Sequence, residues 1–155
     1  MTTRTVAKVV LPRRERQTLQ GLAAGKTLAE VALDLKIREG TAVGYLKLAK
    51  HKLHGVSDVA AAVAVGYVTE AIERPPLLDP EALFVPREQR DLVSFIARGI
   101  TALQMAAELG RPVTDVRADG RDLLMALGAR NRPHLITRAW QFRILTTDQV
   151  TRWIR

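Results

Sequence analysis

The chain has 155 residues, and its 24 lysines and arginines outnumber its 16 aspartates and glutamates, so the formal net charge is +8. A basic chain favours a polyanionic partner such as nucleic acid or an anionic membrane surface. The chain contains no cysteine, which excludes disulfides and thiolate zinc sites.

No segment is typical of a membrane-spanning or secreted protein. The longest apolar stretch, 59–68, is too short to cross a bilayer. The N-terminal segment contains Lys8 and is too short and too polar for a secretory signal. We therefore expect a cytoplasmic protein with no membrane partner. His51, His54 and His134 are scattered without a second class of ligand, so we predict neither a metal site nor a cofactor.

The chain repeats itself without a gap at an offset of 74 residues. The identical pairs are Pro12/Pro86, Arg16/Arg90, Ala23/Ala97, Gly25/Gly99, Thr27/Thr101, Ala32/Ala106, Leu35/Leu109 and Leu53/Leu127. Such self-similarity predicts two copies of one folding unit. We predict an all-α protein with tandem four-helix domains at 10–72 and 84–145, a proline-rich linker at 73–83, and a short C-terminal helix within 146–155.

Each copy begins with two short predicted helices. Apolar residues recur at helical spacing over about 13–24 and end before Gly25, which is typical of a helix C-terminus. Thr27 and Glu30 have the spacing of a capping box, and Thr101 and Gln104 have it in the second copy. The second helix is therefore predicted to begin at the same place in both copies.

The third predicted helix is amphipathic in both copies. Its inward positions are Ala42, Leu46, Ala49 and Leu53 in the first copy and Val116, Gly120, Leu123 and Leu127 in the second. Its outward positions are Val43, Gly44, Lys47, Lys50 and His51 in the first copy and Arg117, Ala118, Arg121, Leu124 and Met125 in the second. Two short helices, a tight connection and a longer helix with a basic outer face outline a helix-turn-helix.

The fourth predicted helix, from Asp58 to about Ile72, is apolar on nearly every side and must be buried against a partner surface. Its counterpart covers 133–145, and the simplest partner for each of these helices is the other. Val59, Val63, Tyr67, Leu135 and Trp140 are the residues expected to pack between the copies or in a homodimer. Thr146 and Gln149 then have capping-box spacing and open the terminal helix, which could lock the copies together or cover an apolar face.

Several segments resemble the LuxR/GerE-type helix-turn-helix domain of bacterial transcription regulators. They are Leu11-Pro12-Arg13-Arg14-Glu15, Leu22-Ala23-Ala24-Gly25, Glu30-Val31-Ala32, Ile37-Arg38-Glu39-Gly40-Thr41 and Lys52-Leu53, with Ala97-Arg98-Gly99 and Leu127-Gly128-Ala129-Arg130-Asn131-Arg132 in the second copy. The resemblance covers roughly 10–70 and 84–140. It implies a third helix that enters the major groove of DNA and a fourth helix that mediates dimerisation. Glu15 and Gln89 fall at the family's glutamate position and are expected to anchor the first helix.

The resemblance implies a set of DNA-binding residues on each third helix. They are Arg38, Thr41, Val43, Gly44, Lys47 and Lys50 in the first copy and Arg117 and Arg121 in the second. Lys50 and Lys52 are expected to contact phosphates, and Thr41 to contact a phosphate or to cap the helix. The family's early lysine is replaced by Val43 in the first copy and by Arg117 in the second. Three aspartates accompany the arginines in the second copy, so that copy either contacts DNA or is kept for packing or partner binding.

Two functions remain open from the sequence. The first is a bacterial regulator that binds double-stranded DNA through tandem domains acting as a pseudo-dimer. The second is an interaction module that binds RNA polymerase or another regulator and acts as a co-activator or anti-activator. Kinship with the C-terminal domain of sigma factors is a third interpretation, which the match at 127–130 disfavours. No catalytic constellation is present, so we expect no enzyme, and we expect no sensory domain within the chain.

Overall fold

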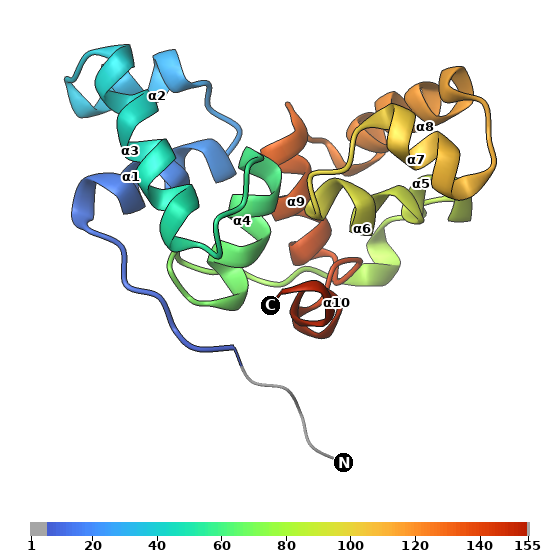
Figure 1. Cartoon of the computed structure of the whole chain (residues 1–155). Helices are drawn as coiled ribbons and strands as arrows, with labels where there is room; N and C mark the ends of the chain where they lie inside the picture. Colours follow the sequence, from blue (N-terminus) through green and yellow to red (C-terminus); the bar gives the residue numbers. More distant parts are fainter. Residues whose placement is uncertain (1–5, 155) are drawn as a thin grey trace.

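The computed structural model describes residues 6–154, and all regular structure in that range is helical (Figure 1). The prediction of an all-α fold is confirmed. None of the helices in this range is long and apolar enough to cross a membrane.

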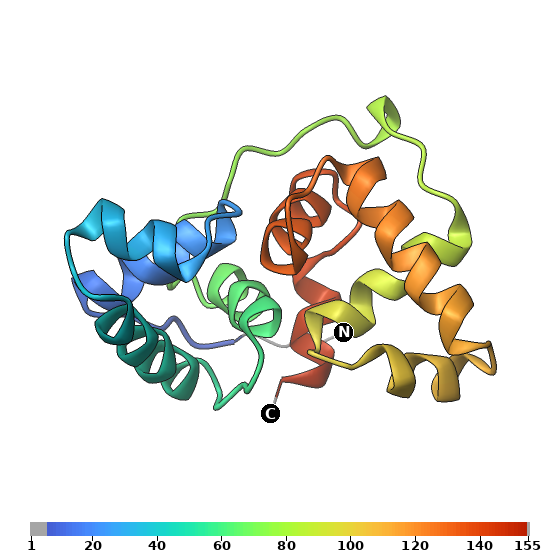
Figure 2. The same ribbon diagram turned by 90° about the horizontal axis from the view of Figure 1, so that it is seen from above.

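The helices form two units that lie side by side (Figures 1 and 2). The first unit contains α1 (Arg13–Ala23), α2 (Leu28–Leu35), α3 (Glu39–Lys52) and α4 (Val59–Val68). The second unit contains α5 (Arg87–Arg90), α6 (Leu92–Ala97), α7 (Ala102–Leu109), α8 (Val113–Leu127) and α9 (Arg132–Gln141). A 3-10 turn, η1 (Pro80–Ala82), lies between the units, and α10 (Thr147–Trp153) follows the second.

Capping boxes begin three of these helices, as the sequence predicts. The hydroxyl of Thr27 accepts a hydrogen bond from the backbone N–H of Glu30 at 3.1 Å, and the Glu30 carboxylate accepts one from the backbone N–H of Thr27. The same reciprocal bonds begin α7 at Thr101 and α10 at Thr146. Each box satisfies two backbone donors that a helix start would otherwise leave unpaired.

The two units follow the same backbone path through their turns. Left-handed residues occur at matching places in each, where a helix ends and the chain reverses. The pairs are Gly25 and Gly99 (φ 95° and 75°), Lys36 and Gly110 (57° and 62°), His54 and Gly128 (61° and 63°), and Glu70 and Arg143 (60° and 60°). The first three pairs are 74 residues apart and the last is 73 apart. The second unit is therefore one residue shorter between its third and fourth helices.

The units also differ in their first and fourth helices. The first helix of the second unit is broken into α5 and α6 at Asp91, whereas α1 is continuous. The fourth helices are shorter than predicted, since α4 ends at Val68 rather than Ile72 and α9 ends at Gln141 rather than Leu145. In both, the chain turns immediately after the helix through the left-handed residue just described.

The centre of the molecule is the pair of fourth helices, α4 and α9, which pack on one another. All residues from Ala60 to Val68 are buried. The Thr137 hydroxyl donates its one proton to the backbone carbonyl of Ala23 at 2.6 Å. Because that proton is used, the Tyr67 hydroxyl is the donor in its 2.7 Å hydrogen bond with Thr137 Oγ1. Burial raises the pKa of Tyr67 to about 12. The Tyr67 ring also lies 5.4 Å from the Trp140 ring.

The contacts between the units are reciprocal. Helix α1 packs against α9, and its counterpart α6 packs against α4. An ideal Cβ on Gly99 would lie 2.8 Å from Asp58, the residue that caps α4. In the matching place, Asn131, which caps α9, donates through Nδ2 to the carbonyl of Gly25 at 3.0 Å. In Figure 2, α3 and α8 lie on opposite sides of the central pair.

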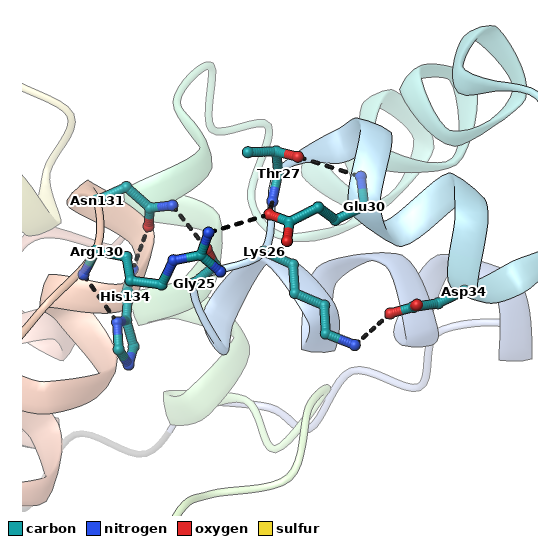
Figure 3. A network of polar contacts seen from close by, with 8 residues as sticks. All are labelled: Gly25, Lys26, Thr27, Glu30, Asp34, Arg130, Asn131 and His134. Atoms are coloured by element: carbon teal, nitrogen blue, oxygen red, sulfur yellow. Dashed lines mark hydrogen bonds and ion pairs between the residues drawn. The ribbon is translucent and has the colours of Figure 1, made fainter.

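A polar network at this interface joins α9 to the end of α1 and the start of α2 (Figure 3). Arg130 lies 3.4 Å from the Glu30 carboxylate, and its backbone N–H donates to Nδ1 of His134 at 3.0 Å. The neighbouring Lys26 and Asp34 form an ion pair within the first unit. Because Nδ1 of His134 accepts a hydrogen bond, the neutral form of the ring is the one that fits here.

We expect Gly25→Ala to destabilise the fold more than Gly55→Ala. Both glycines have a positive φ, where an added Cβ costs about 1–2 kcal/mol. A Cβ on Gly25 would also lie 3.0 Å from the His134 ring, whereas a Cβ on Gly55 would meet nothing within 4 Å. Denaturant unfolding of both variants checks this. Equal losses of unfolding free energy would show that the close approach of the units at Gly25 does not add to the cost of the substitution.

Acidification is expected to weaken the fold through His134. Burial lowers the pKa of His134 below its ordinary 6.5, and the nearby Arg138 and Arg130 charges lower it further. The unfolded chain therefore takes up a proton before the folded one does, and stability declines as pH falls from about 6.5 towards the folded-state pKa. The unfolding free energy of His134→Gln is expected to change less over this window than that of the unaltered chain. Equal pH slopes would contradict the assignment.

The connecting segment and the terminal helix pack onto this core. The Leu78 N–H donates to the carbonyl of Gln141 at 2.8 Å, and the Gln141 side chain donates to the carbonyl of Pro76 at 3.1 Å. The predicted linker thus lies along the end of α9. Helix α10 contacts both α4 and α6; Val150 on this helix and Ile154 directly after it are buried.

Candidate nucleic-acid interface

The interface is built on the turn between α2 and α3. Lys36 adopts a left-handed conformation at the end of α2, and the N–H of Ile37 bonds back to the carbonyl of Ala32 at 3.0 Å. Helix α3 then begins at Glu39, with Arg38 as its N-cap. This three-residue connection sets α3 across α2 and packs both against α1.

The inward face of α3 is buried as the sequence predicts. Ala42 and Ala49 are fully buried and Leu46 is 5% exposed, while Leu53 caps the helix inside the core. The ion pair between Lys52 and Glu15 fixes the C-terminal end of α3 to α1, because the Lys52 ammonium lies 2.8 Å from the nearer oxygen of the buried carboxylate. A long, exposed helix face is thereby held rigidly against the core.

The outward face of α3 combines a small, uncharged first half with a basic second half. Val43 is half exposed, and a Cβ on Gly44 would meet nothing within 4 Å. Lys47 is exposed one turn later, and its ammonium has no hydrogen bond or ion pair within residues 6–154. The half-exposed Leu48 lies beside it and was missed in the sequence prediction, although it follows Gly44 at the helical spacing of four.

The remaining predicted residues of α3 fall into two groups. Arg38 and Thr41 are exposed at the start of the helix, where Arg38 is the N-cap and Thr41 stands in the first turn. The expected capping role of Thr41 is therefore wrong. Lys50 is half-buried and donates to the carbonyl of Ser57 at 3.3 Å. Lys52 was predicted to contact phosphate, and that prediction is wrong because its ammonium is held by Glu15.

The corresponding helix of the second unit, α8, has a different charge. It carries two arginines and three aspartates, a net charge of −1, whereas α3 carries three lysines and one glutamate, a net charge of +2. Arg117 and Arg121 are both exposed. Arg111 forms an ion pair with Asp119, and this hydrogen bond raises the pKa of Arg111. Phosphate attraction is therefore weaker at α8 than at α3.

The second unit also lacks the anchor that fixes α3. Gln89 occupies the place of Glu15, and its buried Oε1 has no hydrogen-bond partner in the part of the chain that the structure describes. The place of Lys52 is taken by Ala126. Gly120, which the sequence predicts to be buried, is instead partly exposed and borders a pocket. The missing side chain leaves a space that Leu46 fills in the first unit.

The residues predicted to pack between the units lie on or beside the central helices. Val63, Tyr67 and Leu135 are fully buried, Trp140 is 7% exposed, and Val59 is half-buried at the start of α4. No three histidine, aspartate or glutamate side chains between residues 6 and 154 gather to form a metal site.

A short helix, a tight turn and a second helix with an exposed face, packed on a preceding helix, define a helix-turn-helix domain. Residues 9–65 match the family described as "Bacterial regulatory proteins, luxR family". The first unit therefore contains one LuxR/GerE-type helix-turn-helix domain, of a family of regulatory proteins rather than enzymes. The match does not extend to the second unit. No curated protein and no solved structure matches the chain.

Proposed function

We propose that this chain is a cytoplasmic transcription regulator that binds double-stranded DNA through α3. The observation that carries the proposal is the exposed face of α3 within a LuxR-type domain, with Val43, Gly44 and Lys47 directed outward. The small residues allow close approach of the helix to base edges, and Lys47 supplies a charge for the phosphate backbone or a guanine edge. Arg38 and Thr41 at the start of the helix add further contacts, and Lys50 contributes a weaker one.

In this proposal, residues 84–145 are a diverged second copy of the domain at 10–72, and the two act as a pseudo-dimer. The matching left-handed turns and the reciprocal contacts of α1 with α9 and of α6 with α4 support it. An isologous interface has this pattern, in which each side contributes the same two surfaces. Because α9 already covers α4, the proposal needs no second chain. Arg117 and Arg121 on α8 would then meet an unequal half-site.

The test is fluorescence anisotropy with a pool of genomic DNA fragments. Lys47→Glu is expected to weaken binding by about tenfold and to reduce the dependence of affinity on salt, because a phosphate contact is lost and a repulsive charge is added. The matched control is Arg152→Glu, which makes the same charge change on the exposed side of α10. If both variants lose affinity equally, the binding follows net charge alone and the proposed role of α3 is wrong.

A second candidate function is a module that binds RNA polymerase or another regulator. The net charge of −1 on α8 and the 79% exposure of Met125 on that helix favour it. Absence of duplex binding at low salt, where phosphate contacts are strongest, would favour this candidate over the first.

A further inference from the structure

The second unit contains an apolar pocket of about 320 Å³ between α6, α7, α8 and α9. Its floor is made of buried side chains, among them Leu92, Met105 and Leu135, which are at most 1% exposed. Its rim carries Arg117, Arg121 and Arg132, which are all exposed. No carboxylate lines it. The volume is at the lower end of the range for small-molecule sites.

The pocket exists because of one residue, Gly120. This glycine stands on the inward face of α8, in the place that Leu46 occupies on α3, and a Cβ on it would meet nothing within 4 Å. In the first unit the Leu46 side chain is 5% exposed and belongs to the core. A glycine in the middle of a helix costs about 1 kcal/mol relative to alanine, so Gly120 lowers the intrinsic stability of α8.

The rim charges determine the kind of molecule that fits. Arg117 and Arg121 are one helical turn apart, and Arg132 stands at the start of α9. Their guanidinium groups have no ion pair within residues 6–154, and Asp119, which lies two residues from each of the α8 arginines, is held by Arg111. A planar guanidinium binds a carboxylate with two parallel hydrogen bonds. An apolar floor below a rim of arginines is complementary to an aliphatic body with a carboxylate end.

We propose that this pocket binds a small aliphatic carboxylic acid, with its chain on the floor and its carboxylate between the arginines. The same arginines are the residues of α8 that the pseudo-dimer would present to DNA. A bound carboxylate neutralises them, and it therefore weakens the DNA contact of the second unit, while DNA weakens the binding of the acid by the same factor. This consequence rests on the proposed function, but the binding of the acid does not.

The probe is sodium octanoate, titrated into the whole protein without DNA and followed by amide chemical shifts. The expected result is saturable shifts confined to α6, α7, α8 and α9. Gly120→Leu is expected to abolish them by filling the floor, and the double substitution of Arg117→Gln with Arg121→Gln is expected to weaken binding by about tenfold or more. Gly40→Leu is the matched control, because it fills open space on a helix of the first unit, and it is expected to bind octanoate normally.

Three outcomes would overturn the proposal. They are no saturable binding to the unaltered chain, unchanged binding in Gly120→Leu, and octanol binding as tightly as octanoate. The first two would show that the pocket takes no ligand, and the third that the arginines do not select a carboxylate. Since Gly120→Leu could disturb the helix instead of the pocket, its circular dichroism and unfolding midpoint are compared with those of Gly40→Leu. If the pocket explanation holds, Gly120→Leu remains folded.

The effect on DNA is a separate readout. Octanoate is expected to lower the affinity of the unaltered chain for the genomic DNA pool and to leave that of Gly120→Leu unchanged. A chain that binds octanoate but no DNA would refute the proposed function and support the pocket. A chain that binds DNA but no octanoate would refute the pocket and support the proposed function.

Discussion

A chain that ends at residue 83 is expected to lose the cooperative fold of the first unit when studied as a monomer. Helix α4 is buried from Ala60 to Val68, and it lies between α1 and α3 on one side and α6, α9 and α10 on the other. Removing the second unit exposes part of this apolar surface. Each large apolar side chain exposed costs about 1.5–3 kcal/mol, and a few such losses equal the stability of an ordinary domain.

Circular dichroism and thermal unfolding of the truncated chain check this expectation. The control is to add the separate segment 84–155, which restores α9 and is expected to restore helix content and a single unfolding transition. A truncated monomer that unfolds cooperatively near the midpoint of the whole chain would show that the two units do not share a core.

Trp140→Ala is expected to cost about 3–5 kcal/mol of unfolding free energy, more than any other single substitution discussed here. Trp140 is 7% exposed on α9, its ring lies 5.4 Å from that of Tyr67, and the Arg74 guanidinium lies 5.5 Å from its centroid. The alanine variant removes these contacts and leaves a cavity where the two fourth helices meet.

Trp153→Ala is the matched control, because Trp153 is only half-buried at the end of α10. Urea unfolding gives both free energies. Trp140→Phe, which keeps an aromatic ring beside Tyr67, is expected to retain most of the stability. Equal losses for the two alanine variants would place the main core of the molecule elsewhere than between α4 and α9.

Local patterns in the sequence were sufficient to predict the starts of three helices, α2, α7 and α10. The boxes at Thr27, Thr101 and Thr146 depend on side chains three residues apart, and each is present in the structure. The inward face of α3 followed from helical spacing. The early ends of α4 and α9 were not predictable in this way, because apolar residues continue past Val68 and Gln141 after the backbone has turned.

Side-chain partners distant in sequence account for what was missed in the candidate interface. Lys52 has the charge and position of a phosphate contact, and only its approach to Glu15, 37 residues earlier, removes it from that role. The pocket at Gly120 was equally hidden, because a glycine on an apolar stripe indicates a weak helix and gives no sign of the space beside it. The one feature of the sequence that could have indicated the pocket is that Leu46 stands at the matching position of the first unit.

The attachment of the 73–83 segment to the end of α9 has a consequence for how the two units pair. A homodimer forms only above the concentration set by its dissociation constant, so its activity falls steeply as the protein becomes scarce. Here the two units belong to one chain, and the hydrogen bonds of Leu78 and Pro76 with Gln141 fix the connecting segment to the end of α9. Pairing is then intramolecular, and a few molecules per cell are as fully paired as many. Under the proposed function, DNA binding would then follow copy number linearly, without a threshold.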